Sequence, residues 1–528
     1  MNKWVVALII TGGLVFLNSL GNGFVWDDEV QIVGNPAIRS LLNFGQAFGG
    51  GTFDTGGAGL AKGFYRPMVT IYYMLVYKVF GLNAFGYHFF QIILHLINGI
   101  LIFKLFSQFA NEKWAGWMSL VWIVHSGISK TVVYAASVGD VLYTLFGLLA
   151  LINLKKSFWT GAFLLLALLS KESAIILIPI LLIFSKKSMP AVFSATGMYA
   201  MFRLFTQTNI PKLDLALITQ ASFYERFLTL SSIFGNYLRL IFWPIRLTIS
   251  QHWVVLNISD VRFWGWGVLV ALFLIICLIL LLKIKNKSAW IMFIWFLMGI
   301  ALVSSLIVPL DGTLDETWLY FPLIGFMGVV AILFDHLNES THNLTVGVSS
   351  RCRTSSEYGQ PTILQSGFCR DKKLSVILLS LIVIFLSLRT IIRNFEWHDG
   401  LMLYGQAIKN SPPSYELENN YGVELFRKGD ILQAGNHFEK SIQLQPRWWF
   451  PYNNLGAVYQ RQGDFAKAEE LYKKSIARVD YYLAYENLAI LLQKRGDKQE
   501  IETFLREALQ KFPQNEVLNT LARDFLAR

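Results

Sequence analysis

Three consecutive carboxylates, Asp27, Asp28 and Glu29, follow the first apolar run of the chain and lie beside Trp26. Acidic side chains at the edge of hydrocarbon are costly unless they are solvated, paired or used in a reaction. A buried carboxylate is a common general base for taking the proton of a hydroxyl group. The residue types therefore make Asp27 and Asp28 candidate catalytic residues, with a hydrated anionic loop as the alternative.

Several cations lie close to apolar segments, where a positive charge can stabilise an anionic leaving group such as a lipid phosphate. Arg66 is the best placed of them, because the proline after it fixes the backbone. Lys171, beside Glu172 between two short apolar halves, and Arg203 are further candidates. With Glu29 they form the predicted substrate and lipid-phosphate site. A mutual Lys171–Glu172 pair at a helix break is the alternative.

Asp140 is the only charged residue between Lys130 and Lys155, inside a predicted membrane crossing. An ionisable group in a membrane is a functional candidate by default, and a structural, hydrogen-bonded Asp is the alternative. His125 ends the preceding apolar run and could approach Asp140 across the turn. With a carboxylate from an outer loop the two could hold a divalent cation, the one cofactor that the sequence suggests. The three cysteines lie far apart and add neither a metal site nor a disulfide framework.

A membrane domain must position these residues, because 54% of the 528 residues are hydrophobic and only 15% are charged. This composition excludes an ordinary soluble enzyme. Apolar runs that can cross about 30 Å of hydrocarbon, alone or as paired shorter runs, predict about eleven spans. They lie at 4–20, 86–106, 114–127, 131–154, 158–170, 174–185, 190–206, 263–282, 289–308, 318–334 and 374–391. We interpret the first as an uncleaved span.

The formal net charge of +11 is concentrated in short Lys and Arg clusters beside these runs. Such clusters mark the cytoplasmic side of a membrane and do not favour nucleic-acid binding. Counting alternate crossings puts all of them, the N-terminus and the loop 335–373 on that side. The loops 21–85 and 207–262 and everything after about residue 392 then lie on the outer face, where we expect function. A bacterial inner membrane or an endoplasmic reticulum membrane fits this topology.

The tail of the chain is soluble and repetitive. Two of its segments superimpose at a period of 34 residues, and a third follows at 33. The matched pairs are Gly422 with Gly456, Gly429 with Gly463, Ala434 with Ala468 and Phe438 with Tyr472. This pattern predicts about three tetratricopeptide (TPR) helix pairs, with a partial unit at 396–412. The concave face of such arrays commonly binds peptides or proteins, and a purely architectural role is the alternative.

Five segments carry a resemblance to a known family. In chain order they are FVWDDEVQIVGNPAI, YRPMVTIYYMLVYKVFGLNAFGYHFFQIILHLIN, LVWIVHSGISKTVVYAASVGDVLYTLFGLLAL, LLSKESAIILIPILLI and DETWLYFPLIGF. With the repeats behind them, they resemble the GT-C superfamily of polyprenyl-phosphate-sugar glycosyltransferases, most closely the transmembrane, TPR-containing protein O-mannosyltransferases. The resemblance implies an all-α chain, with a GT-C-like membrane domain over 1–391 and a TPR superhelix over 392–528.

The resemblance also implies that the catalytic base is Asp27 or Asp28, which activates an acceptor hydroxyl. The donor would be a polyprenyl-phosphate monosaccharide, and an inverting displacement would release the lipid phosphate. The repeats favour a protein or peptide as the acceptor. The alternative is a non-catalytic membrane scaffold whose repeats assemble partners. A transporter is disfavoured, because the intramembrane charges do not recur in matching positions of two halves.

Overall fold

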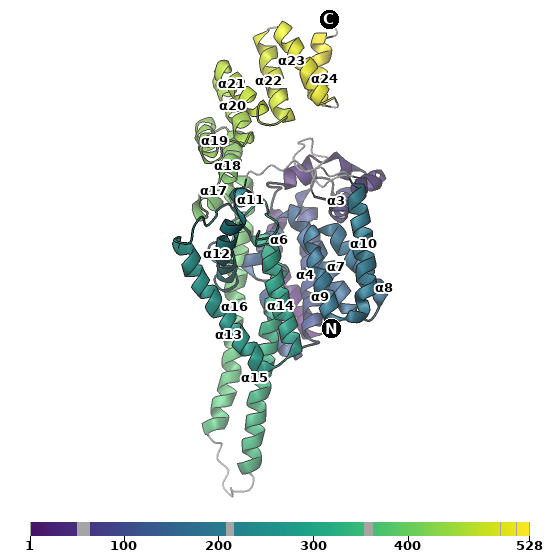
Figure 1. The fold of residues 1–528 in the computed structure, drawn as a ribbon, viewed down its shortest axis with the longest axis vertical. Helices are drawn as coiled ribbons and strands as arrows, with labels where there is room; N and C mark the ends of the chain where they lie inside the picture. Colours follow the sequence, from purple (N-terminus) through teal and green to yellow (C-terminus); the bar gives the residue numbers. More distant parts are fainter. Residues whose placement is uncertain are drawn as a thin grey trace.

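The structure is a computed structural model that describes residues 2–49, 64–206, 216–352, 363–496, 498–513 and 515–526, without the side chains of 339–373. Helices dominate the described residues. Their one sheet pairs β1 (Ser250–Gln251) antiparallel with β2 (Leu314–Asp315). The predicted all-α class is confirmed. Figure 1 shows a bundle of long helices and, at one end of it, a stack of shorter helices.

The bundle is the apolar part of the chain, up to Glu396. Its helices are α1 (Lys3–Phe16), α2 (Gln46–Gly49), α3 (Pro67–Phe80), α4 (Ala84–Phe106), α5 (Glu112–Ile123), α6 (Ser129–Val133), α7 (Val138–Ile152), α8 (Ser157–Ser170), α9 (Leu177–Phe184), α10 (Met189–Phe205), α11 (Leu217–Gln220), α12 (Phe223–Phe242), α13 (Val261–Ile284), α14 (Lys287–Leu302), α15 (Pro322–Cys352) and α16 (Ile363–Glu396). Short turns of helix join them, among them η2 (Glu29–Val33), η7 (Ala135–Ser137), η8 (Glu172–Ile176) and η10 (Glu316–Leu319).

Six helical stretches in the described ranges are long and apolar enough to cross a membrane. They are Lys3–Gly21, Ala84–Phe106, Ala135–Ile152, Val261–Ile284, Glu316–Asn338 and Leu374–Glu396. Four shorter apolar helices accompany them, at Pro67–Phe80, Ser157–Ser170, Glu172–Phe184 and Lys287–Leu302. The chain is thus a membrane protein, and the count of about eleven crossings stays a prediction. The span in α7 is 72% buried and that in α13 only 6%, so α7 is central to the bundle and α13 faces lipid.

Small residues allow the helices of the bundle to approach closely, as is common in membranes. A Cβ at Gly116 on α5 would lie 2.1 Å from the Trp4 ring on α1. A Cβ at Gly325 on α15 would lie 2.7 Å from the Met292 carbonyl on α14. Neither contact has room for a side chain, so these two helix crossings depend on glycine.

The stack consists of three helix pairs between two single helices. The first helix is α17 (Gly400–Asn410), and the pairs are α18 (Tyr415–Lys428) with α19 (Ile431–Leu444), α20 (Phe450–Gln462) with α21 (Phe465–Ile476) and α22 (Tyr482–Arg495) with α23 (Lys498–Lys511), followed by α24 (Glu516–Leu526). A Cβ at Gly422 would meet the Phe438 ring at 2.7 Å, and one at Gly456 would meet the Tyr472 ring at the same distance. The 34-residue period therefore reproduces one packing contact, which confirms the TPR prediction. The boundary at 391–392 stays a prediction, and α16 runs on to Glu396.

Three segments that are far apart in the sequence meet where the bundle faces the stack. The Gly23 N–H donates to the His398 carbonyl at 3.0 Å. His252, from the loop before α13, lies 2.9 Å from Glu416 at the start of α18. The three segments predicted to share the outer face therefore lie at the same end of the bundle (Figure 1).

Candidate active site

Asp28 holds the turn that follows the first span. It is fully buried, and its Oδ2 accepts the Val25 N–H at 3.1 Å while its Oδ1 accepts the Ala136 N–H at 2.7 Å. Trp26, inside this turn, has a φ of 57°, which is rare for a bulky residue. Such strain persists only where the surroundings enforce it. Both oxygens of Asp28 already accept hydrogen bonds, so its contacts are those of a structural residue.

Asp27 is the carboxylate of the pair that is only half-buried. Its N–H donates to the Tyr134 hydroxyl at 3.2 Å. Burial raises the pKa of Asp27 from 3.8 to about 6, although a hydrogen bond from Tyr134 and the charge of Lys130 lower it. A general base works best when its pKa lies near the working pH. Asp27 is therefore the better candidate for the base.

Lys130 is a buried cation next to this carboxylate. Its Nζ lies 2.6 Å from the Asp315 carboxylate and donates to the Ile249 carbonyl at 2.7 Å. The same Nζ lies 4.9 Å from the centroid of the Trp26 ring, a cation–π contact. Lys130 thus ties the strained turn to the loops that contain β1 and β2.

Arg66 lies at the N-terminus of α3, with Pro67 at the first helical position. Its Nε and Nη2 donate to the two oxygens of Glu172 at 2.9 and 2.6 Å. Two parallel bonds of this kind fix both the position and the orientation of the guanidinium group. Arg66 is therefore held in one orientation at the edge of the bundle.

Lys171 pairs with Asp140 rather than with its neighbour Glu172. Its Nζ lies 2.6 Å from Oδ2 of Asp140, and both side chains are largely buried. Burial lowers the pKa of the Arg66 guanidinium, but Glu172 and, to a smaller extent, Asp140 raise it, so the net shift is upward. These two cations and two carboxylates form one cluster whose formal charges cancel, which we call the charge cluster.

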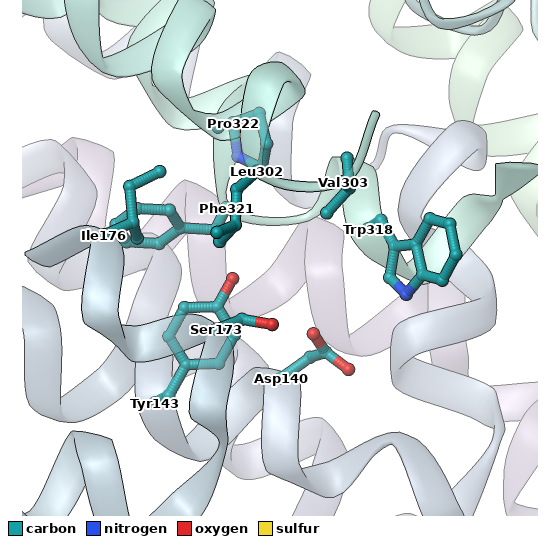
Figure 2. A pocket seen from close by; sticks show the side chains of 10 residues that line it. Asp140, Tyr143, Ser173, Ile176, Leu302, Val303, Trp318, Phe321 and Pro322 are labelled. Carbon is teal, nitrogen blue, oxygen red and sulfur yellow. The ribbon is translucent and has the colours of Figure 1, made fainter. Parts of the chain in front are cut away.

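A narrow pocket borders the charge cluster. Asp140, Tyr143 and Ser173 present oxygen atoms to it, and Trp318 closes one side (Figure 2). The walls come from α7, η8, α14, η10 and the start of α15. Of the four residues in the charge cluster, Asp140 is the one that lines this pocket.

The TPR part of the chain matches a family model, and most of the chain has relatives. Residues 450–514 match the tetratricopeptide repeat model. Protein O-mannosyl-transferase F38B6.6 of Caenorhabditis elegans is 25% identical over 472 residues, which cover 84% of this chain and 63% of that protein. The human protein O-mannosyl-transferases TMTC3 and TMTC1 are 22% and 24% identical, over 87% and 84% of this chain and 53% and 55% of their own lengths.

The chain resembles the TPR-containing protein O-mannosyl-transferases. It spans between 53% and 63% of the length of these three relatives. Among solved structures, the crystal structure of the APC/C hetero-tetramer Cut9-Hcn1 matches 87% of this chain and 96% of its own at 14% identity, with a TM-score of 0.23. That score is too low to support an inference.

The other two residues predicted for the substrate and lipid-phosphate site are Arg203 and Glu29. Arg203 lies at the end of α10, near Tyr65; burial raises the pKa of Tyr65, and the Arg203 charge lowers it. Glu29 contacts the TPR domain, because its two oxygens accept from Arg427 at 2.6 and 2.7 Å. A substrate-binding role for either residue stays a prediction, and Glu29 has a structural partner.

The predicted metal ligands do not come together. His125 accepts the Gly127 N–H on Nδ1 at 3.1 Å, and its Nε2 lies 3.0 Å from the Ile241 carbonyl. Asp140 is paired with Lys171. Within the described ranges, no group of three or more His, Cys, Asp or Glu could hold a metal ion. The donor set around His125 and Asp140 therefore does not fit a divalent cation.

Sequence reasoning missed Lys130, Tyr134 and Asp315. In the sequence, Lys130 lies between two apolar runs and marks one end of the stretch in which Asp140 is the only charged residue. Its isolation in such a segment is the available signal, because a buried Lys needs a partner. That partner, Asp315, is 185 residues away, so no local pattern could reveal it.

Proposed function

We propose that the chain is a membrane-embedded, inverting glycosyltransferase that moves a monosaccharide from a polyprenyl-phosphate carrier to a protein hydroxyl. The sugar is mannose, by analogy with the relatives. One observation carries the proposal: a half-buried carboxylate of raised pKa, Asp27, lies close enough to Arg66 of the charge cluster for the Arg66 charge to lower that pKa. Such a pair of sites suits a reaction in which one group gains a proton while another gains negative charge.

Asp27 takes the proton of the acceptor hydroxyl. The oxygen then attacks the anomeric carbon of the donor, and the bond from that carbon to the phosphate oxygen breaks. Its electron pair leaves with the lipid phosphate. A single displacement from the opposite face inverts the anomeric centre.

The charge cluster stabilises the leaving group. The donor is a phosphodiester with one negative charge, and the released lipid phosphate gains a second. Arg66 and Lys171 are already paired with carboxylates, so they bind the donor weakly and the developing charge more strongly. Stabilisation that grows towards the transition state raises the rate rather than only the affinity.

Lys130 and Tyr134 keep Asp27 ionised. Burial alone would raise the pKa of this carboxylate further, and Tyr134 and Lys130 lower it. The balance leaves a base that is mostly ionised at neutral pH and still basic enough to accept a proton.

We place the loop of Asp27 and the TPR domain on the outer face of the membrane, with the N-terminus in the cytoplasm. The distribution of Lys and Arg supports this orientation. The contacts of the TPR domain with loops 21–85 and 207–262 support a common side for all three. A bacterial inner membrane or an endoplasmic reticulum membrane meets these conditions.

Release of polyprenyl phosphate from a panel of polyprenyl-phosphate monosaccharides, by the protein in nanodiscs with a Ser/Thr-containing acceptor, tests the proposal. We expect turnover with one sugar, and its loss in Asp27→Asn at unchanged melting temperature. Full turnover in Asp27→Asn would refute the assignment of the base. No turnover of the wild type with any donor would favour a membrane scaffold, in which Arg66–Glu172 and Lys171–Asp140 are only structural ion pairs.

A further inference from the structure

Arginines from two helices meet on the short segment that follows α12. Nε and Nη2 of Arg389, on α16, donate to the Ile245 carbonyl at 3.2 and 3.0 Å. Nη1 of Arg239, in the last turn of α12, donates to the next carbonyl, that of Arg246, at 3.0 Å. Three arginines therefore lie at two adjacent peptide groups. We call Arg239, Arg246 and Arg389 the arginine cluster.

The carboxylates nearby do not balance the arginine cluster. The charged groups at this place are four arginines and two glutamates: Arg239, Arg246, Arg389, Arg393, Glu316 and Glu396. Both glutamates pair with Arg393, and Glu396 also pairs with Arg389. Within the described ranges, Arg239 and Arg246 take part in no ion pair. The group therefore has a formal excess of two positive charges.

Arg239 is the cation of the cluster that most needs an anion. Its side chain is half-buried, and burial is the largest cause of its lowered pKa. The charge of Arg246 lowers this pKa further, because two like charges lie close together, and the opposing effect of Glu316 does not restore it. An arginine is seldom buried without a partner. An anion between Arg239 and Arg246 would offset both burial and repulsion.

The segment beside the arginine cluster faces lipid. Phe242, Trp243 and Ile245 are exposed, with 60%, 62% and 41% of their surface accessible. The Trp243 ring stacks on Phe385, within the span Leu374–Glu396, with the ring centroids 6.0 Å apart. Tryptophan is enriched where the hydrocarbon of a membrane meets its headgroups. The segment therefore lies at a membrane boundary.

The arginines lie on the headgroup side of this boundary. Arg389 follows Phe385 by four residues, which is one helical turn towards the end of the bundle that faces the stack. Arginine side chains extend along apolar surface and keep the guanidinium group in the polar layer. Arg246 is exposed and Arg239 half-buried, so a headgroup can reach both.

The ligand that matches this place is an anionic phospholipid. A guanidinium group presents paired N–H donors that fit two oxygens of a phosphodiester. The acyl chains of the same molecule can cover the exposed rings of Phe242 and Trp243. A soluble phosphate would leave these rings uncovered, and a zwitterionic lipid brings no net charge to offset the excess of two.

The segment that binds the arginines also reaches the candidate active site. It continues from Ile245 to β1, and on this path the Thr248 N–H donates to Glu316. The Ile249 carbonyl accepts from Lys130, which lies next to Asp27. A ligand on the arginine cluster therefore holds one end of a segment whose other end contacts Lys130.

We propose that Arg239, Arg246 and Arg389 bind the phosphodiester headgroup of an anionic phospholipid and that this lipid orders residues 243–249. The site shares no residue with the charge cluster, and the inference does not depend on the proposed function. The ligand is a lipid of the surrounding bilayer, so the occupancy of the site follows the composition of the membrane.

The test compares nanodiscs of phosphatidylcholine with nanodiscs in which part of this lipid is replaced by phosphatidylglycerol with the same acyl chains. Hydrogen exchange of the full-length protein, without donor, is measured in peptides that cover 243–249. We expect phosphatidylglycerol to slow this exchange in the wild type. In Arg239→Gln with Arg246→Gln, the share of phosphatidylglycerol that gives half of the effect should rise at least about tenfold, because two charged contacts are lost.

Arg262→Gln is the matched control. Arg262 lies in the same predicted outer loop and carries the same charge, but it is paired with Asp260 at 2.6 Å. This variant should respond to phosphatidylglycerol like the wild type. An equal response of the double variant and the wild type would place the effect of the lipid elsewhere and refute the arginine cluster as its site.

Two soluble probes distinguish a lipid from a free anion. Glycerophosphoglycerol, which is the headgroup without acyl chains, and inorganic phosphate should leave the exchange of 243–249 unchanged in phosphatidylcholine nanodiscs. A slowing as large as that by phosphatidylglycerol would show a site for soluble phosphate and refute the lipid. Equal exchange of wild-type residues 243–249 in the two bilayers would also refute the proposal, whether or not the double variant folds.

Discussion

The protonation of Asp27 should set the acidic limb of the pH–rate profile. Burial is the largest cause of its raised pKa of about 6, and only the ionised form accepts a proton. The ionised fraction is then about 0.09 at pH 5 and about 0.91 at pH 7, a tenfold rise in rate. A solvated Asp, with a pKa of about 3.9, is more than about 90% ionised at both values. For such a residue the two rates would differ by less than about a tenth.

Tyr134→Phe tests why the acidic limb of the pH–rate profile lies near pH 6. The hydrogen bond from Tyr134 lowers the pKa of Asp27, so its removal should move the limb to higher pH, by on the order of one unit. Tyr224→Phe, an exposed tyrosine on α12, is the matched control. The assay is the initial rate of polyprenyl phosphate release in nanodiscs at saturating donor. A flat wild-type profile between pH 5 and 7, or a limb that Tyr134→Phe leaves in place, would refute the reasoning.

Four further outcomes are expected. Asp28→Ala should lower the free energy of unfolding by about 3 kcal/mol, since two backbone N–H groups lose their acceptor; thermal melts that match the wild type would contradict this. Arg66→Gln should lower polyprenyl phosphate release at least about tenfold, and Arg66→Lys should restore only part of it, because lysine lacks the paired donors that grip Glu172. Gly456→Val should destabilise the TPR domain by about 2 kcal/mol or more, because its Cβ would lie 2.7 Å from the Tyr472 ring; an unchanged melt of the domain would refute this packing. EDTA should leave transfer unchanged, because both predicted metal ligands bind protein partners.

The repeat domain could be predicted in detail because its determinants are local. Glycines 34 residues apart indicated the TPR period, and the structure gives Gly422 and Gly456 the same ring contact at 2.7 Å. Gly429 and Gly463 each end a first helix in the left-handed conformation, with φ of 88° and 86°. Both signals arise within one helix pair, so they can be recognised in the sequence without knowledge of the fold.

The candidate site could be predicted only by residue type. The acidic motif and the cations were found, but their partners come from other helices. Arg66 pairs with Glu172, 106 residues away, and Lys171 pairs with Asp140, 31 residues away. The sequence pointed instead to a mutual Lys171–Glu172 pair as the alternative, because only adjacent charges are visible without the fold.

The choice between Asp27 and Asp28 shows the same limit more sharply. The two are adjacent and chemically identical, and the family pattern does not separate them. The structure does, because both oxygens of Asp28 accept backbone N–H groups. One N–H is that of Val25 in the same turn, and the other is that of Ala136 in η7, which no local pattern reveals. An Asp with both oxygens used for backbone bonds keeps the turn in shape.

The environment of Asp27 joins the membrane domain to the repeats. Burial is the largest cause of the raised pKa of Asp27, and Glu416, from the first TPR helix, raises it further. Lys130 and Arg66, from the bundle, lower it. Glu416 is held at 2.9 Å from His252, so its charge is kept near the loop by a contact between the two domains. The basicity of the candidate base therefore depends on how α18 sits on the bundle. A TPR domain in this position is more than a tether for partners, because its first helix is part of the electrostatic environment in which the acceptor hydroxyl would lose its proton.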